Sequence, residues 1–116
     1  MTKVRLELNT APPTVNHYWL QRGFRKILSK RAQEFRKEIA VACAGKAPFD
    51  GSVAVSIAYS PPDKRKRDID NIVKPILDAL QCAGVFKDDY QVKTITATRR
   101  EVCRGGSVVI QIEAID

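Results

Sequence analysis

The feature that most constrains the fold is a run of alternating residues at positions 53–59. An apolar residue at each odd position alternates there with Ser or Ala at each even position. Apolar side chains at every second position predict a β-strand with a buried face. The small residues on the second face also permit burial on both sides. Pro61 and Pro62 end the strand, because proline cannot donate a hydrogen bond to a ladder.

Periodicity predicts five further elements around this strand. Ser29 is a candidate N-cap for the first helix, and Gly45 is placed to end it. The resulting order, β-α-β-α-β-β, predicts one α+β domain over residues 1–116, with a small mixed sheet and two helices packed on it. The five elements are strands at 3–9, 92–101 and 107–115 and helices at 30–44 and 68–82.

Three places in this scheme need special geometry. Pro75 lies inside the second predicted helix, so either that helix is kinked or its first turns are looser than a regular α-helix. Gly105 and Gly106 can take the positive φ of a tight hairpin between the last two strands. Residues 10–28 show no clean period, which predicts a functional or mobile loop of some twenty residues.

That loop interleaves aromatic and basic side chains. Rings can stack on bases while cations contact phosphates, so His17, Tyr18 and Arg22 are candidate nucleic-acid contacts. The alternative is a surface loop with Trp19 tucked into the core.

The overall charge points toward a polyanion. Lys and Arg number 20 against 13 Asp and Glu, which gives a net charge of +7 and favours nucleic acid or an anionic surface over a merely soluble basic protein. Cys43, Cys82 and Cys103 are an odd, widely spaced set, which predicts free thiols in a reducing cytoplasm. No stretch predicts a signal peptide or a membrane span, so no membrane partner is expected.

The strongest chemical signal is the stretch KRKRDIDN, in which four cations run directly into two aspartates. The basic run suits a polyanion and Asp-x-Asp suits a metal, so the two are predicted to meet here. A second acidic pair, Asp88-Asp89, follows the predicted helix, which spans roughly 22 Å, so the chain must fold back for the two pairs to converge. One polar face of that helix holds Asp70, Asn71, Lys74, Asp78 and Gln81, and plain solvation is the ordinary interpretation of such a face.

Converging carboxylates either take up protons or bind a cation. An all-oxygen set selects Mg²⁺ or Mn²⁺ and disfavours zinc. Lys74 could neutralise developing charge on a phosphate, or it could be an ordinary i,i+4 ion-pair partner. An EF-hand is disfavoured because the required Gly and Glu are missing. The single His17 argues against histidine-based hydrolysis or a Ser-His-Asp triad.

The stretch PDKRKRDIDNIVKPILDALQCAGVFKDDYQV resembles the RusA family of Holliday junction resolvases of bacteria and their prophages. The likeness extends more loosely to PPTVNHYW and SKRAQEFR, and so covers nearly the whole chain. It implies a homodimeric, Mg²⁺-dependent endonuclease that cuts four-way DNA junctions by paired nicks in recombination and repair.

Carried over by position, the resemblance implies essential carboxylates at Asp68, Asp70 and Asp89 and an essential lysine at Lys74. Asp88 is a weaker metal candidate, and Asn71 and Asp78 are expected to play supporting roles, Asn71 on the DNA side. The basic run, Lys64, Arg65, Lys66 and Arg67, would hold the phosphate backbone beside the metal.

Two other functions stay open on the sequence: a basic DNA-binding module without chemistry, and a nuclease for other branched DNA. The catalytic hypothesis depends on acids from either end of the second helix coming together.

Overall fold

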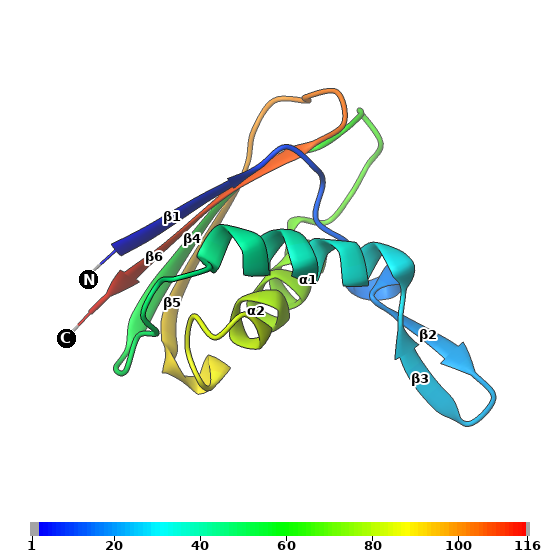
Figure 1. The fold of residues 1–116 in the computed structure, drawn as a ribbon. Coiled ribbons are helices and arrows are strands. Elements are labelled where there is room, and N and C mark those ends of the chain that lie inside the picture. The colour runs from blue at the N-terminus through cyan, green and yellow to red at the C-terminus, as the bar shows by residue number, and fades with distance from the viewer. Residues whose placement is uncertain (1–2, 116) are drawn as a thin grey trace.

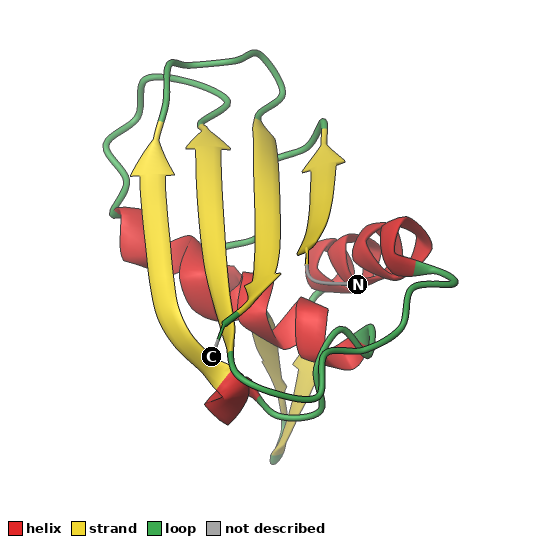
Figure 2. Ribbon diagram, turned by 90° about the vertical axis from the view of Figure 1, so that its left-hand side faces the viewer, coloured by secondary structure: helices red, strands yellow, loops and turns green. Residues whose placement is uncertain are grey.

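Two helices cover one face of a four-stranded sheet in the computed structural model, which describes residues 3–115 (Figure 1; Figure 2). The predicted α+β class is therefore confirmed. In chain order the elements are β1 (Lys3–Leu8), the 3₁₀ turn η1 (Val15–His17), β2 (Trp19–Arg22), β3 (Arg25–Leu28), α1 (Lys30–Cys43), β4 (Val53–Ser60), the 3₁₀ turn η2 (Ile69–Ile72), α2 (Val73–Cys82), the 3₁₀ turn η3 (Asp89–Gln91), β5 (Val92–Arg99) and β6 (Ser107–Ala114).

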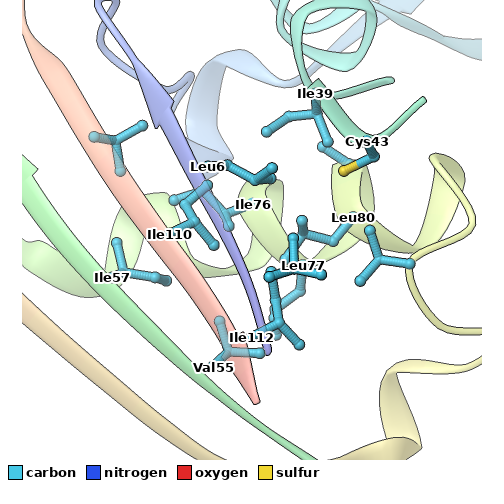
Figure 3. Close-up of a cluster of buried hydrophobic side chains, with 14 of the residues drawn as sticks. Leu6, Ile39, Cys43, Val55, Ile57, Ile76, Leu77, Leu80, Ile110 and Ile112 are labelled. Carbon is cyan, nitrogen blue, oxygen red and sulfur yellow. The ribbon is translucent and has the colours of Figure 1, made fainter. Parts of the chain in front are cut away.

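The hydrophobic core lies between this sheet and the two helices. Figure 3 shows Leu6 of β1, Ile57 of β4 and Ile110 of β6 facing Ile39 of α1 and Ile76 of α2. Alternate residues of β1 and β4 are buried, as the two-residue period predicts. Each fully buried side chain of this size stabilises the fold by about 1.5–3 kcal/mol, so the core fixes which face of each element points inward.

The first helix begins as predicted. The Ser29 side chain, itself 8% exposed, accepts a hydrogen bond from the backbone N–H of Ala32 at 3.1 Å and so caps α1. The helix ends at Cys43, one residue before the predicted end.

The second helix is shorter than predicted and has a looser start. Residues 69–72 form the 3₁₀ turn η2, and α2 begins only at Val73. Pro75 is therefore in the first turn of α2, where its missing N–H would have had no helical partner. Of the two alternatives for this proline, the loose first turns are confirmed. Within residues 3–115, no helix is long and apolar enough to cross a lipid bilayer.

The predicted hairpin between the last two strands is wrong. The sheet order is β1-β6-β4-β5, in which β5 pairs in parallel with β4, and β6 pairs antiparallel with both β4 and β1. Gly105 and Gly106 do take positive φ values of 84° and 78°. Their turn, however, belongs to a connection that passes the end of β4, where the N–H of Arg100 donates to the carbonyl of Tyr59 at 2.7 Å. A tight hairpin and this longer connection can both contain a glycine turn, so the glycines in the sequence did not distinguish the two.

Residues 10–28 are also more ordered than predicted. After η1, strands β2 and β3 form a separate two-stranded antiparallel sheet, with Gly23 (φ 63°) at the turn. Figure 1 shows this hairpin projecting away from the main sheet. All four residues of β2 are exposed, so no alternation of polar and apolar residues marked the strand.

The parallel pair β4–β5 determines where the predicted site residues lie. Parallel neighbouring strands require a crossover connection. Here residues 61–91 form it, and they include α2, which packs on one face of the sheet. The predicted catalytic residues all belong to this one connection. They are Asp68, Asp70, Lys74 and Asp89.

Candidate active site

Lys74 joins helix α2 to the acidic bend that follows it. Its Nζ lies 3.0 Å from Oδ1 of Asp78 and 3.1 Å from Oδ2 of Asp89. Hydrogen bonds to the Asp78 and Asp89 carboxylates raise the pKa of Lys74 above its ordinary value, although partial burial opposes them. The lysine therefore stays cationic through the neutral range. Its side chain is 57% exposed, so solvent screening keeps each pair weak, at about 0–1 kcal/mol.

Asp89 reaches Lys74 because the chain folds back against α2. The backbone N–H of Asp89 donates to Oε1 of Gln81, in the last turn of α2, at 3.2 Å. Gln81 belongs to the predicted polar face of the helix, and its contact is with the acidic bend. Asp89 therefore returns as far as Lys74, but the expected convergence of the Asp88–Asp89 pair with Asp68 and Asp70 is not seen in the described residues.

Asp88 has a local structural role. Its Oδ1 accepts the backbone N–H of Tyr90 at 2.8 Å, and it forms a capping box with Gln91 at the start of η3. The pattern Asp-x-x-Gln in the sequence was a sign of this cap. A carboxylate committed to a backbone N–H has less freedom to turn toward a metal.

Asp68 and Asp70 are exposed and uncommitted. Asp68 is the residue before η2, and Asp70 lies in its first turn. Within residues 3–115, neither side chain has a hydrogen-bond or ion-pair partner. No group of three or more His, Cys, Asp or Glu side chains in that range is close enough to hold a metal. The single chain thus joins Asp89 to Lys74 and leaves Asp68 and Asp70 outside that contact. The free carboxylate oxygens suit a hard divalent ion by their chemistry.

The basic run forms one wall of a hollow beside these carboxylates. From the crossover, Arg65, Lys66, Arg67, Asp68 and Asn71 line it, and from the start of the η1 region come Thr14, Asn16 and His17. His17 and Asn71, predicted as nucleic-acid contacts from distant parts of the sequence, thus share one surface with Asp68.

Comparison with known proteins identifies a family for this chain. A family model described as Endodeoxyribonuclease RusA matches residues 9–113. The chain belongs to the RusA family. It is 32% identical over 109 residues to the crossover junction endodeoxyribonuclease of Enterobacteria phage HK97, with 90% of each chain covered. It is 33% identical over 104 residues to that of phage 82 and 32% identical over 105 residues to that of Escherichia coli K12, covering 87% of each chain in both cases. The predicted family is confirmed, and with it the endodeoxyribonuclease class.

In this RusA family member, Asp63 shapes the basic run. Its Oδ1 accepts from an Arg67 guanidinium nitrogen at 2.7 Å and from the backbone N–H of Arg65 at 2.9 Å. The side-chain hydrogen bond from Arg67, and then the N–H of Arg65, lower the pKa of Asp63 to about 2. Arg99 of β5 donates to the carbonyl of Arg67 at 3.0 Å. Lys64 and Lys66 are exposed, as is Arg65, while Arg67 is drawn onto the loop.

The two predicted residues of the β2–β3 region have different surroundings. Tyr18 is 1% exposed, and its hydroxyl accepts a hydrogen bond from Nε of Arg36 at 2.8 Å. Burial raises the pKa of this phenol. In this conformation the Tyr18 ring cannot stack on a base, whereas Trp19, the residue expected in the core as the alternative, is 45% exposed. Arg22 is exposed at the end of β2.

Sequence reasoning gave no role to three residues that stand out in the structure. Asp63 and Gln91 looked like ordinary loop residues. Phe24 lies at the tip of the β2–β3 hairpin and is fully exposed, flanked by Gly23 and Arg25. The signal for Phe24 was the local string RGFRK, a glycine turn with one aromatic ring among cations.

Proposed function

We propose that this RusA family member hydrolyses phosphodiester bonds in four-way DNA junctions, with Mg²⁺ as its cofactor and Mn²⁺ as a possible substitute. The observation that carries the proposal is the Lys74 ammonium, held by Asp78 and Asp89 one helical turn after the free carboxylate of Asp70. A protein that only binds DNA gains nothing from carboxylates beside its basic surface, since they repel phosphate. The relatives' names, crossover junction endodeoxyribonuclease, agree with it.

Asp68 and Asp70 would hold the metal ion, because both are exposed and free. The family resemblance makes Asp89 a third candidate donor, although in the free chain its Oδ2 is paired with Lys74 and it is not gathered with Asp68 and Asp70. When bound there, a divalent ion supplies Lewis acidity toward the phosphodiester and lowers the pKa of its bound water.

Lys74 would act on the phosphate directly. Its ammonium has three N–H donors, and the two carboxylates account for two. The third is available to a phosphate oxygen, where a fixed cation opposes the charge that develops in the transition state. Asp78 would be a positioning residue for Lys74.

The hollow beside Asp68 would receive the DNA backbone. Lys64, Arg65 and Lys66 are the exposed cations of the run, and each phosphate contact adds about 0.9 to the salt slope of binding to duplex DNA. His17 and Asn71 line the same hollow as hydrogen-bonding side chains. Arg22 and the exposed ring of Phe24 would extend the contact along the β2–β3 hairpin.

A homodimer is part of the proposal. An opened four-way junction presents symmetry-related strands, and a two-fold dimer offers one active site to each, which gives paired nicks. We further propose the bacterial cytoplasm as the place of action, because the relatives come from coliphages and Escherichia coli.

The test compares Mg²⁺-dependent cutting of a four-way junction with cutting of a linear duplex of the same sequence. Asp70→Asn should abolish cleavage while junction binding survives. Glu34→Gln, which removes an exposed carboxylate on α1, is the control and should cleave like the wild type. Binding without any cleavage by the wild type would favour the non-catalytic module. Equal cutting of flaps and junctions would favour a broader branched-DNA nuclease.

A further inference from the structure

One side chain holds the acidic bend from both sides. Nε2 of Gln91 donates to the carbonyls of Phe49 and Gly51, each at 2.9 Å. Its Oε1 accepts the backbone N–H groups of Lys87 at 3.0 Å and Asp88 at 3.2 Å. A primary amide has two N–H donors and an oxygen with two lone pairs, so all of its hydrogen-bonding capacity is used.

These four bonds join segments about forty residues apart in the sequence. Phe49 and Gly51 belong to the segment that leads into β4, and the bend leads into β5. Phe49 is itself fixed, because it is 7% exposed and its N–H donates to the carbonyl of Val85 at 2.8 Å. The Gln91 amide therefore ties the bend to a rigid part of the domain.

We infer that Gln91 is a positioning residue, which holds the Asp88–Asp89 bend so that the Asp89 carboxylate stands against Lys74. Asp89 lies inside the turn that Gln91 closes, and the backbone N–H of Gln91 also donates to the carbonyl of Asp88 at 3.0 Å. Among the described residues, the only side-chain hydrogen bond to the Asp89 backbone is from its N–H to Gln81. Without the Gln91 side chain, Asp89 keeps this bond, the exposed ion pair with Lys74 and the hydrogen bonds within η3, but none of these ties the bend to the segment that leads into β4.

The role requires an amide of this length. Glutamate would keep the two acceptor interactions but would place a charged oxygen against the carbonyls of Phe49 and Gly51. Asparagine keeps the amide but is one methylene shorter and cannot bridge both sides. Methionine has nearly the same volume and shape and makes none of the four bonds.

The inference rests on the proposed function for its kinetic test but has a separate structural test. Hydrogen exchange of the Asp89 amide is the structural readout, because that amide is bonded to Gln81 and not to Gln91. In Gln91→Met the Asp89 amide should exchange at least about tenfold faster than in the wild type. Exchange limited to Lys87 and Asp88, with Asp89 unchanged, would overturn the inference.

The kinetic test uses junction cleavage by the full-length protein. Gln91→Met and Gln91→Glu should lower kcat by about tenfold or more, with KM for the junction changed less than about threefold. Gln111→Met, on the sheet face away from the helices, is the matched control and should leave both constants unchanged. An unchanged kcat in Gln91→Met would overturn the inference. If Gln91→Met does not fold, Gln91→Asn is tested against the same criteria. If the wild type cleaves no junction, the proposed function fails while the exchange test of Gln91 still decides.

Discussion

The basic run offers a prediction whose size follows from the structure. Of its four cations, Lys64, Arg65 and Lys66 are exposed, and Arg67 is drawn onto Asp63. If each of the three exposed cations neutralises one phosphate, replacing all three by Gln lowers the salt slope of binding by about 2.7, at about 0.9 each. Between 50 and 200 mM salt, a slope difference of about 2.7 changes the affinity ratio of wild type to variant by about 40-fold.

Fluorescence anisotropy with a labelled four-way junction measures this slope. Both proteins would carry Asp70→Asn, so that the substrate stays intact during titration. The matched control replaces Lys30, Lys37 and Lys46, which are exposed on or after α1, and so removes the same net charge elsewhere. General attraction between a cationic protein and DNA predicts equal slopes for the two triple variants.

The prediction would be refuted by a slope change below about 1 for the loop variant, or by one equal to that of the α1 control. Arg67→Gln forms a separate case, because it removes the partner of Asp63 as well as a cation. Its loss of affinity should exceed that of any single exposed cation, since the loop itself is loosened.

Three further predictions concern single side chains. Lys74→Met should lower kcat for junction cleavage by about 10²–10³-fold, as for loss of a transition-state donor, with junction affinity measured in parallel and nearly unchanged. The pairing of Asp63 lowers its pKa from 3.8 to about 2 in the folded protein. The stability that this pairing contributes is therefore fully present above about pH 3.8 and is lost as the pH falls through about 2. Urea unfolding measured from pH 5 to pH 2 should show the wild type losing its stability advantage over Asp63→Asn. Gly106→Ala should lower the free energy of unfolding by about 1–3 kcal/mol more than Gly105→Ala does. Both glycines have positive φ, but only at Gly106 would an added Cβ meet Ala11, whose own Cβ would lie 2.7 Å away. Equal losses of stability in the two variants would refute the steric argument.

Local signals in the sequence predicted the helices and most strands. Ser29 marks a helix start by chemistry that acts within three residues, and the alternation in β4 reflects burial of one face. Pro75 indicated irregular first turns, because the proline ring clashes with a regular α-helix in the residues that precede it.

Strand order and aromatic burial were beyond such signals. β6 inserts between β1 and β4, and β5 takes the outer edge, which depends on the crossover and not on the turn at Gly105 and Gly106. The sequence does not indicate which of the adjacent rings of Tyr18 and Trp19 is buried. In the structure Tyr18 is the buried ring, and its hydroxyl accepts a hydrogen bond from Arg36.

The candidate site also has a part that the sequence predicted and a part that it did not. Sequence spacing predicted that Asp70, Lys74 and Asp78 follow one another by helical turns, and the pairing of Lys74 with Asp78 is the direct result. The path of the chain after α2 was not predictable, since it depends on Gln81 and Gln91 bonding to backbone groups of the bend. The position of Asp89, an acid predicted from the sequence, therefore depends on two glutamines, Gln81 and Gln91, to which the sequence analysis gave no such role.

The crossover explains why Asp89 meets Lys74 and not the two aspartates at the start of the helix. Helix α2 has 10 residues and spans about 15 Å, with Asp68 before its start and Asp89 beyond its end. Carboxylates separated in this way cannot touch unless the chain returns along the helix, and here the return brings Asp89 only as far as the flexible lysine side chain can reach. Lys74 thus offsets the repulsion between Asp78 and Asp89, the two carboxylates that it does contact.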